Sequence, residues 1–295
     1  MDARRLHPLL VPLDGSAPAD HLLRLAEIVA ELVDGHIHAL FVGAETLSRD
    51  SLLARMRIPP AWAERIEVEG ATGDAASVIP EVARRLGAAA IVLSSHGATG
   101  DLSALAGHVT LAALSAAPCP VFVVRSALSV LGQAHRLRHL RRILVPLDGT
   151  PEAVQSVTDA ARLAERAHAR LLMLHIVSSD PLAARPHIAP AYSDQYYHEL
   201  EAWRDEFVRI GFAACDRPAD VPIDVTLRLG EPALAIAQFA AEEDCDLIVA
   251  AWGGRLSPGR AAVVRKLLAE APCPLLFSRA RVGQRGADKN MSGRP

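Results

Sequence analysis

Two eight-residue segments of this 295-residue chain are nearly identical. Leu9 to Ser16 reads LLVPLDGS, and Ile143 to Thr150 reads ILVPLDGT. Their aspartates, residues 14 and 148, lie 134 positions apart, which indicates two tandem copies of one module. Each copy is long enough to bury its own core without disulfides or a metal ion. Every functional inference therefore has to be made for each copy separately.

In both copies a short β-rich segment ends in Asp-Gly and a hydroxyl residue, and a helical pattern follows. Ser16 and Thr150 are the predicted N-caps, with Pro18 and Pro151 in the first helical turn. Further apolar segments alternate with helical patterns, which predicts an α/β fold with five parallel strands in each copy and helices on both faces. These segments are 36–42, 65–68, 90–93 and 117–125 in the first copy, and 170–177, 223–229, 247–250 and 271–279 in the second.

Composition and charge exclude several classes of function. A net charge of −3 and a pI near 6.5 give no basic surface for nucleic acid or an anionic membrane. No apolar run approaches the roughly 18 residues of a membrane span, so we expect a cytoplasmic protein. The cysteines lack both CxxC and zinc-site spacing, and we expect buried, reduced thiols at Cys119, Cys215, Cys245 and Cys273.

The first copy carries the residue types of a mononucleotide pocket. In an open parallel sheet, ligands bind beyond the carboxyl ends of the strands, where the winding direction reverses. Asp14 ends the first strand, and the loop after the fourth reads SSHGATG over residues 94–100 before Gly107 and His108 open a helix. Closely spaced glycines at a helix N-terminus let backbone N–H groups approach phosphate, while a carboxylate accepts hydrogen bonds from ribose hydroxyls.

These residues resemble the universal stress protein family in its tandem form. The resemblance rests on both VPLDG(S/T) segments, the SSHG loop and the two APCP segments at residues 117–120 and 271–274. It implies two doubly wound, Rossmann-like domains of HUP type, each with strand order 3-2-1-4-5 and each able to dimerise along its last strand. The expected units are domain 1–126, linker 127–140, domain 141–280 and a polar, disordered tail 281–295.

One branch of the family binds ATP through Gly, two residues, Gly, nine residues, then Gly and Ser or Thr. In the first copy Gly97 and Gly107 match the last two glycines, whereas Ser94 and His108 replace the first glycine and the hydroxyl residue. His96 either contacts the ligand or caps the loop. The alternative is a vestigial or differently occupied pocket. The residues expected to contact ATP are Pro12, Leu13, Asp14, Val42, Leu93, Ser94, His96, Gly97, Gly107, His108 and Val109.

The second copy departs further from this pattern. With Gly254 aligned on Gly97, the stretch from that glycine to the APCP proline measures 18 residues instead of 21. Trp252 stands where a small or polar residue is expected, and a tryptophan there could close the pocket. Asp148 is interpreted as a turn carboxylate that caps the next helix. We therefore expect ATP in the N-terminal domain only.

The copies also differ between their second and third strands. The second copy has a longer segment with an apolar helical stripe, interpreted as a covering helix in preference to a lid or partner surface. The stripe comprises Tyr196, Leu200, Trp203 and Phe207. The first copy offers only Ser51 to Trp62, interrupted by Pro59 and Pro60, which predicts a less covered sheet and a more open pocket.

Other catalytic signals are weak. His36 and His38 form an HxH pair, but without a neighbouring carboxylate or cysteine set in the sequence a metal site is disfavoured. No metal is predicted beyond Mg²⁺ that accompanies a nucleotide. The chain has no GxxxxGK(S/T), no GxSxG and no GxGxxG after the first strand, so nothing nominates a general base.

The combined prediction is a stress-response regulator that binds ATP or a related adenine nucleotide. The alternatives are an interaction module of the same fold that binds no nucleotide, and a very slow ATP hydrolase. Residues 121–125 and 275–279 would otherwise leave apolar edges exposed, so we expect them to join the copies as an intramolecular pseudo-dimer. Protein partners, and pairing of two whole chains as a homodimer, are left open.

Overall fold

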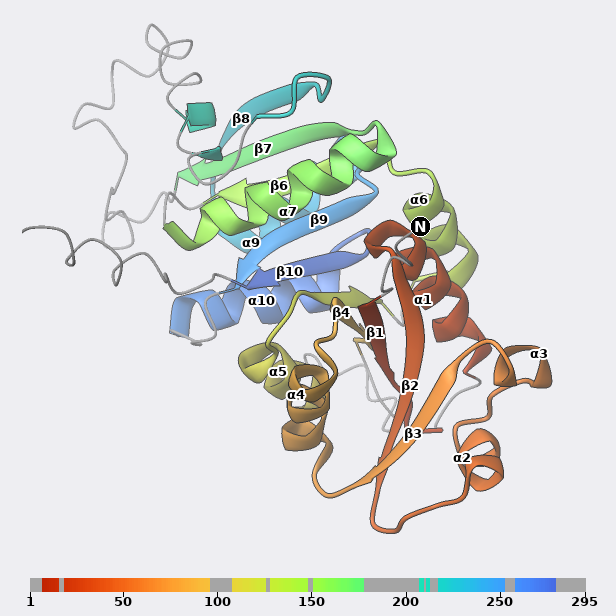
Figure 1. The fold of residues 1–295 in the computed structure, drawn as a ribbon. Coiled ribbons are helices and arrows are strands. Elements are labelled where there is room, and N and C mark those ends of the chain that lie inside the picture. The colour runs from red at the N-terminus through yellow and green to blue at the C-terminus, as the bar shows by residue number, and fades with distance from the viewer. Residues whose placement is uncertain are drawn as a thin grey trace, which may run out of the picture.

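The computed structural model in Figure 1 describes residues 7–15, 19–95, 108–125, 128–147, 151–177, 207–209, 211–212, 217–252 and 258–279. The strands of the first copy are β1 (His7–Pro12), β2 (Gly35–Gly43), β3 (Glu67–Thr72), β4 (Ala90–Ser94) and β5 (Val121–Val124). Those of the second are β6 (Arg142–Leu147), β7 (Arg170–Val177), β8 (Ile223–Leu229), β9 (Leu247–Trp252) and β10 (Leu275–Arg279). All ten form one sheet, ordered β3-β2-β1-β4-β5-β10-β9-β6-β7-β8, so each half has the predicted order 3-2-1-4-5.

Helices cover both faces of this sheet (Figure 1). One face carries α1 (Asp20–Val33), α2 (Arg49–Arg55), α3 (Pro60–Ala63), α6 (Val130–Arg138) and α7 (Pro151–Ala167). The other carries α4 (Ala75–Leu86), α5 (His108–Ala116), α9 (Pro232–Glu242) and α10 (Pro258–Glu270). Pro151 begins α7 as predicted. The predicted N-cap of the first helix is wrong, because α1 begins at Asp20 with Ala19, and not Ser16, at the N-cap position. Ser16, Pro18 and Thr150 themselves lie outside the described residues. No helix in the described ranges is long and apolar enough to span a membrane.

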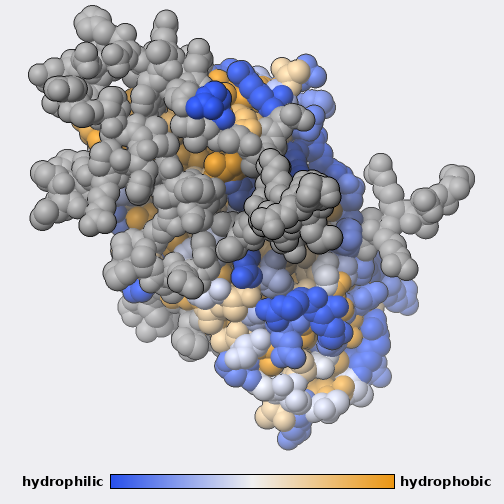
Figure 2. All heavy atoms as spheres, turned by 60° about the vertical axis from the view of Figure 1, so that its left-hand side comes forward, coloured by the Kyte–Doolittle hydropathy of each residue, from blue (hydrophilic) through white to orange (hydrophobic). Residues whose placement is uncertain are grey.

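The two halves meet at the final strands. β5 and β10 pair antiparallel, with Leu276 opposite Phe122 and Phe277 opposite Val121, which is the pairing predicted for these apolar segments. The apolar residues form two clusters, one on each face, and each contains residues of both halves. On the face shown in Figure 2, hydrophilic side chains predominate over the described part of the first copy, below the centre. The two halves therefore share an apolar layer on each face of one continuous sheet.

The segment predicted as a linker contains a packed helix. Ser129 caps α6 by accepting a hydrogen bond from the backbone N–H of Gly132. The side-chain amide of Gln133 makes two hydrogen bonds to the backbone of Arg125. Its oxygen accepts from the N–H at 2.8 Å, and its nitrogen donates to the carbonyl at 2.9 Å. Arg136 donates to the Asp244 carboxylate of the second copy, at 2.9 Å. The connection is thus fixed to both halves.

Two short helices cover the part of the first-copy sheet that we expected to be less covered, whereas most of the corresponding segment of the second copy lies outside the described residues. Residues 49–63 form α2 and α3, and the side chains of Leu52, Met56 and Trp62 are buried against the core. The indole N–H of Trp62 donates to the Asp20 carboxylate at 3.0 Å. The prolines interrupt one helical pattern, but because proline is well tolerated in a first helical turn, a second short helix starts at Pro60.

Two smaller predictions have mixed outcomes. The third strand of the first copy runs from Glu67 to Thr72 and not over 65–68, because α3 ends only at Ala63. Three of the four thiols are buried and free, as predicted, and the fourth, Cys215, lies outside the described residues. Burial raises the pKa of the Cys119 and Cys245 thiols to about 12, so these groups stay protonated and unreactive.

Candidate functional site

The carboxyl ends of three neighbouring strands define the candidate site. β1 pairs with β2 on one side and with β4 on the other, so the winding direction reverses beside β1. The ladder registers place Asp14 level with Val42 and with Ser95. Asp14 is exposed, and Leu13 is anchored by a 2.8 Å hydrogen bond from its N–H to the carbonyl of Leu40. The sheet therefore presents the Asp14 carboxylate at its topological switch point.

The head of α5 lies over the end of β4. The hydroxyl of Thr110, in the first turn of α5, donates to the Ser94 carbonyl at 3.1 Å, and Thr110 is 4% exposed. Val109 beside it is 36% exposed. The first backbone N–H groups of a helix have no acceptor within the helix, so they are available to an anion. The Asp14 turn and the start of α5 thus both lie at the carboxyl end of β4.

Some of the predicted site residues lie at strand ends, one begins α5, and the others lie outside the described residues. Pro12 and Val42 are partly buried at the strand ends, whereas Leu13 and Leu93 are core residues, 8% and 4% exposed. For His108 the structure gives only its position as the first residue of α5. The predicted residues outside the described ranges are His96, Gly97 and Gly107, together with Asp148 and Gly254 of the second copy.

Gly15 is a structural requirement of the site that our sequence analysis did not identify. Its φ of +74° lies in the region that favours glycine, and a Cβ atom at this position would lie 2.1 Å from the backbone carbonyl oxygen of Arg55. The end of α2 therefore rests on the Asp14 turn. This close contact joins residues 40 positions apart, so no local pattern could have predicted it.

Gly15→Ala is expected to lower the free energy of unfolding by about 2–4 kcal/mol, since it combines left-handed backbone strain with a clash against backbone. Gly87→Ala is the matched control, because Gly87 also has a positive φ, +61°, but a Cβ there would meet nothing within 4 Å. The control should lose only about 1–2 kcal/mol. Urea unfolding of both variants measures the difference, and equal losses would contradict the contact with Arg55.

The family model for the universal stress protein family matches residues 59–125 and 139–279, which is most of both copies. The chain belongs to the universal stress protein family. A universal stress protein of Thermus aquaticus is 33% identical over 143 residues, which cover 47% of this chain and 98% of the relative. Among solved structures, a universal stress protein from Archaeoglobus fulgidus covers 94% of this chain and all of its own, with a TM-score of 0.65 and 16% identity.

A second structure from Archaeoglobus fulgidus, a universal stress protein in complex with dAMP, covers 48% of this chain and 98% of its own, with a TM-score of 0.34 and 19% identity. An adenine nucleotide is therefore a ligand of that protein. The longer alignment, over both copies, establishes the tandem fold of the present universal stress protein. The contents of its pocket have to be inferred from its own residues.

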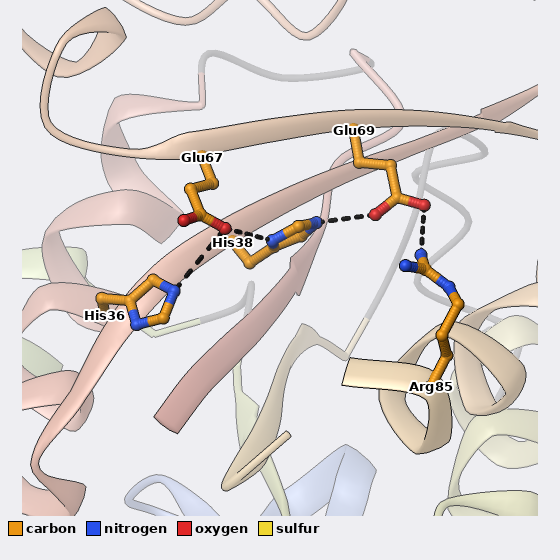
Figure 3. Close-up of polar contacts among 5 residues, drawn as sticks. All are labelled: His36, His38, Glu67, Glu69 and Arg85. Carbon is orange, nitrogen blue, oxygen red and sulfur yellow. Dashed lines mark hydrogen bonds and ion pairs between the residues drawn. The ribbon is translucent and has the colours of Figure 1, made fainter. Parts of the chain in front are cut away.

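The HxH pair lies in a charged cluster on β2 and β3 (Figure 3). The ring nitrogens Nδ1 and Nε2 of His38 each lie 2.9 Å from a carboxylate oxygen, of Glu67 and Glu69 respectively. His36 Nε2 lies 3.6 Å from Glu67, and Arg85 of α4 donates to Glu69. The expectation that no carboxylate lies near the HxH pair is wrong, because β3 supplies two across the ladder.

This cluster is a partly exposed network of hydrogen bonds that includes the Arg85–Glu69 ion pair. Ionised carboxylates only accept hydrogen bonds, so His38 donates to both only when each ring nitrogen carries a proton. The bond from His38 holds the pKa of Glu67 below its usual value. Burial raises the pKa of Glu69, but bonds from Arg85 and His38 outweigh it and hold that pKa below its usual value too. Within the described residues, no group of histidine, cysteine and carboxylate side chains forms a metal site.

His38→Leu is expected to make the free energy of unfolding less dependent on pH in the acid range. Leucine is the chosen replacement because Leu172 occupies the equivalent position in the second copy. The Glu67 and Glu69 pKa values are lower when folded, so their stabilisation is complete above the unfolded pKa near 4.5 and is lost as pH falls through the folded values. Between pH 6 and pH 3 the variant should lose about 1 kcal/mol less than wild type. Urea unfolding at each pH measures this difference, and parallel curves for the variant and wild type would contradict the network.

Two aromatic residues of the second copy have different outcomes. Trp252 is 3% exposed and its indole N–H donates to the carbonyl of Leu114 in α5, so it does not close the pocket of its own copy. Phe207 is buried and meets His175 edge-on at 5.3 Å between ring centroids, as a covering helix requires. The other residues of the predicted stripe, Tyr196, Leu200 and Trp203, lie outside the described residues.

Proposed function

We propose that this universal stress protein binds ATP or a related adenine nucleotide in its first copy and acts in the cytoplasm as a regulator. The observation that carries the proposal is the placement of Asp14 and of the head of α5 at the carboxyl end of β4, at the switch point of the sheet. This is the position at which doubly wound sheets bind nucleotides. The negatively charged Asp14 carboxylate can accept hydrogen bonds from the ribose, and the positive end of the α5 dipole can attract the phosphates.

The chemistry assigns a part of the nucleotide to each residue. The exposed Asp14 carboxylate accepts hydrogen bonds from the ribose hydroxyls. The α5 N-terminus supplies backbone N–H groups and a favourable dipole to the phosphates, and the sequence segment before it carries Gly97 and Gly107 of the family pattern. Pro12 and Val42, partly buried at the strand ends, offer apolar surface to the adenine ring. Any Mg²⁺ enters with the nucleotide.

The second copy is proposed to have lost this function. Its phosphate-loop segment is three residues shorter, and no glycine follows nine residues beyond Gly254, where Val264 and Arg265 stand. The stoichiometry of one nucleotide per chain follows from this difference.

Isothermal titration of the full-length protein with ATP tests the proposal. We expect one site per chain, with a dissociation constant in the micromolar range. Absence of heat at high micromolar ATP, under conditions where a stable fold is verified by circular dichroism, would overturn nucleotide binding. A stoichiometry of two would retain nucleotide binding but overturn the restriction to the first copy.

A further inference from the structure

The C-terminal end of α5 lacks part of its own hydrogen bonding. The last carbonyl groups of any helix have no intrahelical donor and need other partners when they are buried. The residue four positions after Leu114 is Pro118, which has no N–H to donate. Leu114 and Ala117 are 1% and 2% exposed, so water cannot readily replace the missing backbone N–H as a donor to these carbonyls. This end of the helix therefore depends on donors from elsewhere.

Those donors come from the second copy. The Trp252 indole N–H donates to the carbonyl of Leu114, and the guanidinium of Arg279 donates to the carbonyl of Ala117. Trp252 and Arg279 are paired across β9 and β10 in parallel register, so both side chains leave the same face of the sheet. Two adjacent residues of one half thus satisfy two carbonyls at the end of a helix in the other.

The arginine contact has a symmetric counterpart, whereas the position of the tryptophan is held by a different residue type in the first copy. Arg125, at the end of β5, donates to the carbonyls of Ala269 and Ala271 at the end of α10. Strand registers place Trp252 at the position that Ser95 takes in the first copy. A serine side chain is too short to donate across the junction in the way an indole does. The copy that carries the degenerate loop therefore holds the end of α5 with an indole donor as well as with an arginine.

We propose that Trp252 and Arg279 are positioning residues for the phosphate end of the first-copy site. They hold the C-terminal end of α5, and Thr110 holds its first turn to the Ser94 carbonyl, so the nine-residue helix is fixed at both ends. The aim of the α5 N-terminus at a phosphate then depends on the second copy. This inference rests on the proposed nucleotide site and assigns to the degenerate copy a role in it.

The test compares Trp252→Phe and Arg279→Lys with Arg125→Lys, all in the full-length protein. Phenylalanine keeps the buried ring but loses the donor, and lysine keeps the charge but loses the guanidinium fork. Amide hydrogen exchange should accelerate in α5 for the first two variants and in α10 for the third. ATP affinity should fall about tenfold for the first two, the equivalent of one charge-assisted hydrogen bond, and stay within twofold of wild type for Arg125→Lys.

The outcomes separate the two proposals. Unchanged exchange in α5, or equal ATP affinity in all three variants and wild type, would overturn the positioning role while leaving nucleotide binding intact. An equal loss of affinity in Arg125→Lys and Arg279→Lys would show only a general loss of stability and would also overturn it. Failure of the wild-type protein to bind ATP would overturn the proposed function and this inference together.

Discussion

Asp14→Ala is expected to weaken ATP binding by about 100-fold, because two hydrogen bonds from ribose hydroxyls to a charged carboxylate are lost. The fold should be preserved, since the Asp14 side chain is exposed at the end of β1. Calorimetric titration measures the affinity, and the urea midpoint verifies the fold. A loss below threefold would place the ribose away from this turn.

The tandem sequence supplies a matched control at the equivalent position. Asp148→Ala removes the same side chain from the same VPLDG segment in the second copy and should leave ATP affinity unchanged. Gly97→Val tests the predicted phosphate loop, where a branched side chain would prevent the backbone from approaching phosphate and should abolish binding. Equal losses from Asp14→Ala and Asp148→Ala would contradict the functional asymmetry of the two copies.

The repeated pattern predicted most of the fold because it acts at short range. A β-rich run, a turn and a helical stripe each depend on neighbours in the sequence, and the two copies supply each signal twice. The sequence also predicted pairing of the final strands, since apolar edges need a partner. It missed the burial of Met56 and Trp62, because two short helices, the second starting at Pro60, are too short to show a clear periodicity.

The sequence predicted where the candidate site lies, but not the non-local contacts around it. Asp14 and the head of α5 follow from the rule on switch points, which needs only strand order. The contact of Gly15 with Arg55 depends on where α2 ends, and the pairing of His38 with Glu67 depends on the register of β2 and β3. Both are non-local geometries that a single sequence does not encode in any one segment.

Trp252 illustrates the same limit at the junction. In sequence it stands beside a shortened loop, which suggested that it closes its own pocket. Because β5 and β10 run antiparallel, the carboxyl end of β9 lies near α5 of the other half, and the indole finds its acceptor there. Topology, and not proximity in sequence, therefore decides what this residue contacts.

Phe277→Ala is expected to lower the free energy of unfolding by about 3–5 kcal/mol, a large share of the roughly 5–15 kcal/mol typical of a folded protein. The ring is 1% exposed and its strand joins β5 to β9, so its removal leaves a cavity at the junction of the halves. Because both apolar clusters cross that junction, the urea curve should shift as one transition. Leu131→Ala, at a residue 80% exposed, should change stability by less than about 0.5 kcal/mol. A separate transition for one half would show that the shared core does not couple the two copies.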